Sequence, residues 1–125
     1  MIRPLASTAT DRHLARCVEQ AAAHQTRALA WLREARDPAS PLSPARRRAL
    51  LLLALEHLLL ARHLLQRARK VAHEPALLAH LAEHLARLQT IVANTERRLD
   101  ALNVEAGGTG DAAPSASASS VSLSN

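Results

Sequence analysis

Apolar residues recur along most of the chain at alternating steps of three and four, the spacing of one face of an α-helix. Three such rows predict three helices, over about residues 11–35, 44–72 and 75–105. The first row is Leu14, Val18, Ala21, Gln25, Ala28, Leu32 and Ala35. The second row is Leu51, Ala54, Leu58, Ala61, Leu65, Ala68 and Ala72. The third row is Leu78, Leu81, Leu85, Leu88, Val92, Thr95, Leu99 and Leu102.

The residues between the rows predict where each helix begins and ends. Thr10 before an acid resembles an N-cap, and Ser43 followed by Pro44 is typical of a cap with proline in the first helical position. Prolines 38, 41 and 44 predict a stiff loop after the first helix, since proline cannot continue one. Pro75 ends the second helix, and the Gly107-Gly108 pair is a natural stop for the third.

The sequence therefore predicts an all-α protein, an elongated antiparallel three-helix bundle with coiled-coil-like heptad packing. One domain covers residues 10–106, between a flexible N-terminus at 1–9 and a disordered Gly/Ser/Ala-rich tail at 107–125. Small residues recur every seven positions on each helix, which favours close approach of the helix axes. These alanines are Ala21, Ala28 and Ala35, then Ala54, Ala61 and Ala68, and then Ala79, Ala86 and Ala93.

The second helix has more leucine than one buried row requires. Among the leucines of the stretch 49–65 that are not in the row, four fall well outside it and form a candidate partner interface: Leu52, Leu53, Leu59 and Leu60. Apolar patches of this kind usually mark contacts with other proteins. The sequence thus predicts a partner protein or a homo-oligomer, and Leu59→Glu is expected to break association without loss of helicity.

Composition and charge add an alternative function. The chain has 16 Lys and Arg against 11 Asp and Glu, a net charge of +5, and the excess lies on the first two helices. Arg46, Arg47 and Arg48 stand in the first turn of the second helix, where free backbone N–H groups also attract anions. Polyanion or nucleic-acid binding is one alternative, although the chain has no Phe or Tyr on which bases could stack.

Histidines suggest a second alternative, a metal-binding bundle without any other cofactor. His80 and His84 are four residues apart on one helix face, within the spelling H-x-x-E-H of certain zinc peptidases. His73 lies on the same flank, and His57 of the second helix would approach that row if the two helices are antiparallel. The ordinary interpretation is four flanking histidines without a metal, and we favour it.

No catalytic arrangement emerges from the remaining residues. His13 and Cys17 are one turn apart, but no third residue or oxyanion donor accompanies them, and a free cysteine is usually a small buried apolar residue. A single cysteine suits a reducing compartment. The apolar stretch is shorter than a membrane span requires and contains Glu56, so we expect a cytoplasmic protein without a membrane span. Because no catalytic arrangement accompanies the leucine patch, we expect its function to be that of a non-enzymatic adaptor or chaperone-like protein.

Overall fold

The chain forms three long helices, as the apolar rows predict. The computed structural model describes residues 9–110, with side chains as far as Val104. Helix α1 spans Ala9–Arg36, α2 spans Pro44–Val71 and α3 spans Pro75–Gly110. Within this range there is no strand. Most of the flexible N-terminus and of the disordered tail predicted above lies outside the described residues.

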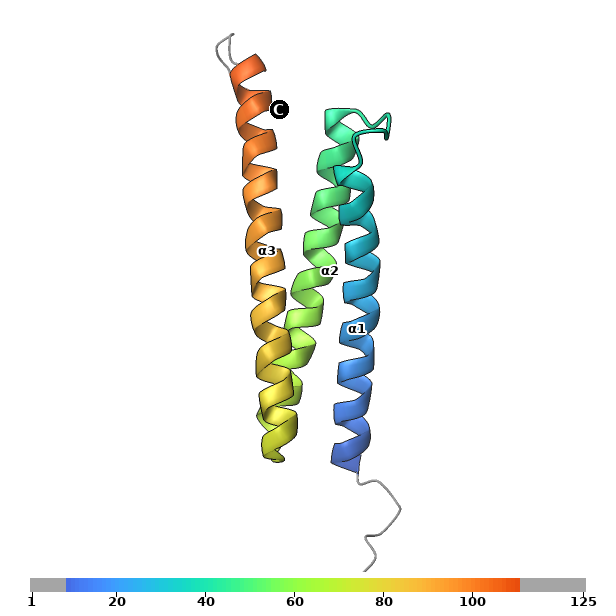
Figure 1. Ribbon diagram of the computed structural model, residues 1–125, viewed down its shortest axis with the longest axis vertical. Coiled ribbons are helices and arrows are strands. Elements are labelled where there is room, and N and C mark those ends of the chain that lie inside the picture. The colour runs from blue at the N-terminus through green and yellow to red at the C-terminus, as the bar shows by residue number, and fades with distance from the viewer. Residues whose placement is uncertain (1–8, 111–125) are drawn as a thin grey trace, which may run out of the picture.

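The helices lie side by side and alternate in direction, which makes an elongated antiparallel bundle (Figure 1). α2 is the central helix: α1 packs closely against it, and α3 packs against it less extensively. α1 reaches α3 through the side chains of Gln25 and His84. Because each connection is short, each helix folds back along the one before it.

Local signals explain the ends of α2 in particular. Ser43 is an N-cap with extended backbone, and its hydroxyl accepts a hydrogen bond from the Arg46 N–H at 3.1 Å. Pro44 follows as the first helical residue, where its missing N–H costs nothing. α1 begins at Ala9, so the predicted N-cap Thr10 lies inside the helix. α3 continues past Gly107-Gly108, because glycine permits a helix stop without imposing one.

The core follows the three predicted rows, most completely on α2 and α3. On α1, Ala21, Ala28, Leu32 and Ala35 of the row are buried, Leu14, Val18 and Gln25 are half-buried, and Cys17, which lies outside the row, is buried as well. On α2 every row position from Leu51 to Ala68 is buried, as is the C-cap residue Ala72, and on α3 the row is buried from Leu81 to Leu99. Thr95 is the one polar residue in this core, and its hydroxyl donates to the Ile91 carbonyl at 2.8 Å. A buried hydroxyl satisfied within its own helix leaves no need for a polar partner on α2.

The alanine rows behave differently on the three helices. On α1 and α2 all six alanines are fully buried, from Ala21 to Ala35 and from Ala54 to Ala68. The prediction for α3 is wrong, because Ala79 and Ala86 are exposed and Ala93 is only half-buried. α3 packs through its leucine row, on the opposite side of the helix. Larger side chains hold helix axes farther apart, in agreement with the looser packing of α3 on α2.

Candidate interaction surface

The side of α2 that faces away from α1 and α3 carries exposed leucines. Leu52, Leu53 and Leu60 are 42, 41 and 44% exposed, respectively. Leu59 differs, because it is half-buried and packs against the core cluster. We call Leu52, Leu53, Leu59 and Leu60 the outer leucine face. A shallow hollow on this face is lined by Leu52, Leu53, Leu55, Glu56 and Leu59.

The same side of α2 becomes basic toward its C-terminal end. We call the residues that line a second hollow there the basic end: His63, Gln66, Arg67, Arg69 and Lys70. A third hollow lies between the two, where Leu60, His63 and Leu64 meet the α1 residues Gln20, Ala23, His24 and Arg27. The outer leucine face and the basic end are therefore neighbouring parts of one surface.

Two of the three arginines at the start of α2 form hydrogen bonds to the neighbouring helices. An Arg47 guanidinium N–H donates to the Ala35 carbonyl near the end of α1. Arg48 Nε donates to Asn103 Oδ1 of α3 at 2.9 Å. Only Arg46 is exposed with its side chain unused. The triplet therefore diverges toward both neighbours of α2, whereas anion binding would need its side chains to converge.

A different group of arginines is brought together by the fold. Burial, together with the nearby charges of Arg36 and Arg47, lowers the pKa of the Arg98 guanidinium below its usual range. The three residues come from α1, α2 and α3, and no carboxylate within the described residues lies at ion-pair distance from any of them. Sequence reasoning missed this group because no spacing along one helix predicts it.

The candidate metal-binding histidines are distributed over separate contacts. His57 faces α1, where its Nδ1 lies 2.9 Å from His24 Nδ1 and its ring meets Trp31 edge-on at 5.0 Å. The expected approach of His57 to the histidines of α3 is therefore wrong: His57 lies on the flank of α2 that contacts α1. His73 and His80 are exposed, and the described part of the chain has no group of three metal-binding side chains.

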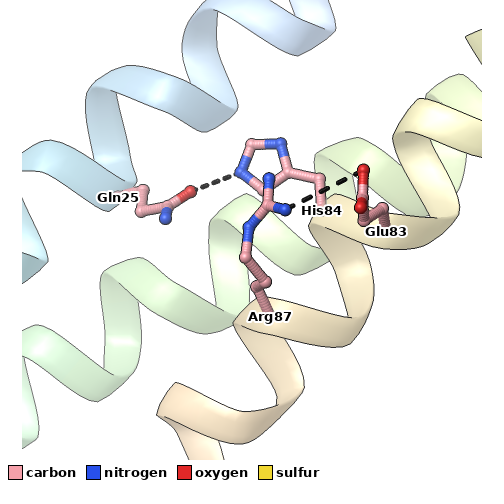
Figure 2. A network of polar contacts seen from close by, with 4 residues as sticks. All are labelled: Gln25, Glu83, His84 and Arg87. Atoms are coloured by element: carbon pink, nitrogen blue, oxygen red, sulfur yellow. Dashed lines mark hydrogen bonds and ion pairs between the residues drawn. The ribbon is translucent and has the colours of Figure 1, made fainter.

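Gln25, the polar interruption in the first apolar row, meets His84 across the bundle. Figure 2 shows the two side chains pointing toward one another from α1 and α3, with 2.6 Å between Gln25 Oε1 and His84 Nε2. Beside them Glu83 forms a 4.0 Å ion pair with Arg87. A polar pair at this position favours one register of α1 against α3.

His24 and His84 resist protonation in the folded chain. Burial lowers the pKa of His24, helped by the charges of His57 and Arg27. Burial also lowers the pKa of His84, helped by Arg87 and His80. Between His24 and His57 one Nδ1 must carry the shared hydrogen, so protonation of both rings would place two N–H groups face to face.

These shifts predict that the bundle loses stability in mild acid. The folded pKa values lie below the ordinary 6.5, so the unfolded chain takes up protons first as the pH falls. The stabilisation is complete above about pH 7 and is lost as the pH falls below 6.5 toward the lowered pKa values of the folded chain. Urea unfolding followed by circular dichroism is expected to show this slope, and a His24→Gln, His84→Gln double variant to flatten it. His63→Gln, which removes an exposed imidazole, is the control; an equal flattening by the control would contradict the assignment.

The only cysteine is buried rather than reactive. Cys17 is 3% exposed, and its Sγ lies 3.6 Å from His13 Nε2 one turn earlier. The thiol belongs to the core of α1, as a small apolar residue would, so a dissolved reagent reaches it poorly.

α2 has the length and composition of a helix able to cross a membrane, so the expectation that its apolar stretch is too short for a membrane span is wrong. Its most apolar window of 18 residues has a mean hydropathy of 1.4, and 33% of that window is buried. The core helix of a water-soluble bundle gives the same signal, and α2 is the central helix here.

Comparison of the chain with protein-family models, with curated proteins and with solved structures finds no match.

Proposed function

We propose that the protein is a non-enzymatic interaction module, an adaptor or chaperone-like bundle that binds a partner protein through the outer leucine face of α2. The observation that carries the proposal is the exposure of Leu52, Leu53 and Leu60 on a helix whose inner row is already fully covered. Each of these three side chains is more than 40% exposed, and an exposed cluster of leucines favours association in water. The single buried thiol suits a cytoplasmic location.

The double variant Leu53→Glu, Leu60→Glu tests the proposal. We expect it to lose the partner or the oligomer and to keep the helicity of the parent chain, because glutamate forms helices nearly as well as leucine. These positions replace Leu59→Glu, since Leu59 packs against the core and its loss would disturb the fold as well. The measurements are capture of host proteins by the immobilised chain, and its mass by size-exclusion chromatography with light scattering.

The control carries the same change of charge at other exposed positions. Ala30→Glu on α1 and Ala86→Glu on α3 leave the outer leucine face intact. The control is expected to behave as the parent chain does. Equal capture and equal mass for parent, variant and control would contradict the proposal.

Polyanion binding is the second candidate, supported by the basic end and by the cluster of Arg36, Arg47 and Arg98. In that case binding to duplex DNA would persist at about 0.15 M salt and fall steeply as salt rises further. Loss of DNA binding on Arg67→Gln, Lys70→Gln, without any effect of Leu53→Glu, would favour this candidate over the first.

A further inference from the structure

The outer side of α2 has a leucine half and a basic half, and both bear on what binds there. We propose, on the basis of the interaction function above, that the occupant is a helix of another protein that carries an apolar row with acidic residues beside it. The apolar row would cover the outer leucine face. The acidic residues would lie against the basic end.

The spacing on the outer side favours a helix as the occupant. Leu52 and Leu59 are seven residues apart, as are Leu53 and Leu60, and Gln66 and Arg67 continue both rows. This is the period of the inner row of α2, which is covered along its length by helices of this chain. A repeat of seven presents the same side to a neighbouring helix turn after turn. From Leu52 to Lys70 the surface is about 27 Å long, enough for a helix of about 18 residues.

The charge of the surface selects an acidic occupant. α2 contains seven arginines and lysines and one acid, Glu56. Among the described residues no carboxylate forms an ion pair with Arg67, Arg69 or Lys70, since the single ion pair joins Arg87 and Glu83. Arg27 of α1 adds a further cation to the hollow beside Leu60. Acidic side chains on the occupant would meet these cations, and complementary charge sets both the choice of partner and its orientation.

A second copy of this chain fits the same surface poorly. If two copies paired antiparallel about the centre of the outer leucine face, Glu56 of one copy would lie beside Glu56 of the other. In parallel pairing the two Glu56 side chains would also meet, and the two basic ends would lie side by side. A shift by one heptad that pairs Glu56 with His63 of the copy places Leu52 and Leu53 opposite Arg67 and Gln66. Each arrangement therefore either apposes like charges or leaves half of the leucines uncovered.

Glu56 also argues against a lipid surface. It lines the hollow together with Leu52, Leu53 and Leu59, in the middle of the part that would enter an anionic membrane. A carboxylate there is repelled by acidic headgroups and resists transfer out of water. A helical partner, by contrast, can place a polar or basic residue opposite it.

The test uses three synthetic 21-residue helical peptides with identical leucine rows, flanked by Glu, Gln or Lys. Binding to the full chain is measured by fluorescence anisotropy at 50 and 300 mM NaCl. We expect the Glu-flanked peptide to bind at least tenfold more tightly than the Lys-flanked one at 50 mM, with a smaller ratio at 300 mM because salt screens the charges. Arg67→Glu, Lys70→Glu is expected to reduce or reverse the ratio, and Leu53→Glu, Leu60→Glu to weaken binding of every peptide at least tenfold.

Each other outcome has a distinct meaning. Equal binding of the three peptides, abolished by Leu53→Glu, Leu60→Glu, would leave the interaction surface standing and overturn the acidic partner. Binding of no peptide would overturn the inference, whereas the proposed function would be overturned only by equal capture and equal mass of the parent, variant and control chains. Binding to vesicles of phosphatidylglycerol and phosphatidylcholine that depends on Leu53 and Leu60, together with weaker binding of the peptides, would overturn the inference in favour of a lipid surface.

Discussion

Replacing Leu58 by alanine is expected to lower the free energy of unfolding by about 3 kcal/mol. Leu58 is fully buried at the middle of the inner row of α2, between α1 and α3. The substitution removes three buried carbon atoms and leaves a cavity that two rigid helices close only in part. Urea unfolding followed by circular dichroism at 222 nm measures the change, and the midpoint is expected to fall without a change in slope.

Leu53→Ala is the matched control for this prediction. The residue is also a leucine of α2, five positions earlier, but it is 41% exposed and lies outside the core cluster. Its loss is expected to change the free energy of unfolding by about 1 kcal/mol or less. Equal destabilisation by the two substitutions would mean that the outer leucine face is a second core, covered by the chain itself or by its own copies.

The inner and outer sides of α2 could be predicted from the sequence, because the geometry of a helix determines on which side each residue lies. An angle of 100° per residue places Leu51 and Leu58 on one side and Leu53 and Leu60 on the other. Leu59 lies at the border between the two, where a small rotation of the helix decides its burial, and periodicity alone placed it on the exposed side. The structure puts Leu59 partly into the core.

The polar contacts between helices could not be predicted in the same way. His24 and His57 are 33 residues apart, and Gln25 and His84 are 59 apart. Each contact depends on the register between two helices and on which flank of one helix faces the other. An apolar row shows only the middle of the buried side of a helix, so it does not predict either. The antiparallel direction of α2 was predicted correctly, yet His57 lies toward α1 rather than toward α3.

The alanine rows show the same limit in the packing itself. Alanine every seventh residue permits close helix approach, but the row must also face a neighbour. On α3 the leucine row faces α2, and the alanines at 79 and 86 are exposed on the other side. The close contact is therefore confined to α1 and α2, where both helices bury their alanines.

That close contact makes α1 sensitive to any larger side chain at its alanines. Ala28→Leu is expected to lower the free energy of unfolding by about 2 kcal/mol, because overfilling a packed interface forces helices apart or strains side chains. Ala28 is fully buried, and α2 is the helix that α1 packs closely against, so the added atoms have no room.

Ala30→Leu makes the same chemical change two residues later, at an exposed position of α1. It is expected to alter the free energy of unfolding by no more than about 0.5 kcal/mol, since leucine and alanine are both good helix formers. Chemical denaturation of the two variants beside the parent chain measures the difference. Equal stability of Ala28→Leu and Ala30→Leu would contradict this prediction. It would mean that the contacts of His24, Trp31 and His57 at the edge of the interface, rather than the alanine row, stabilise the packing of α1 on α2.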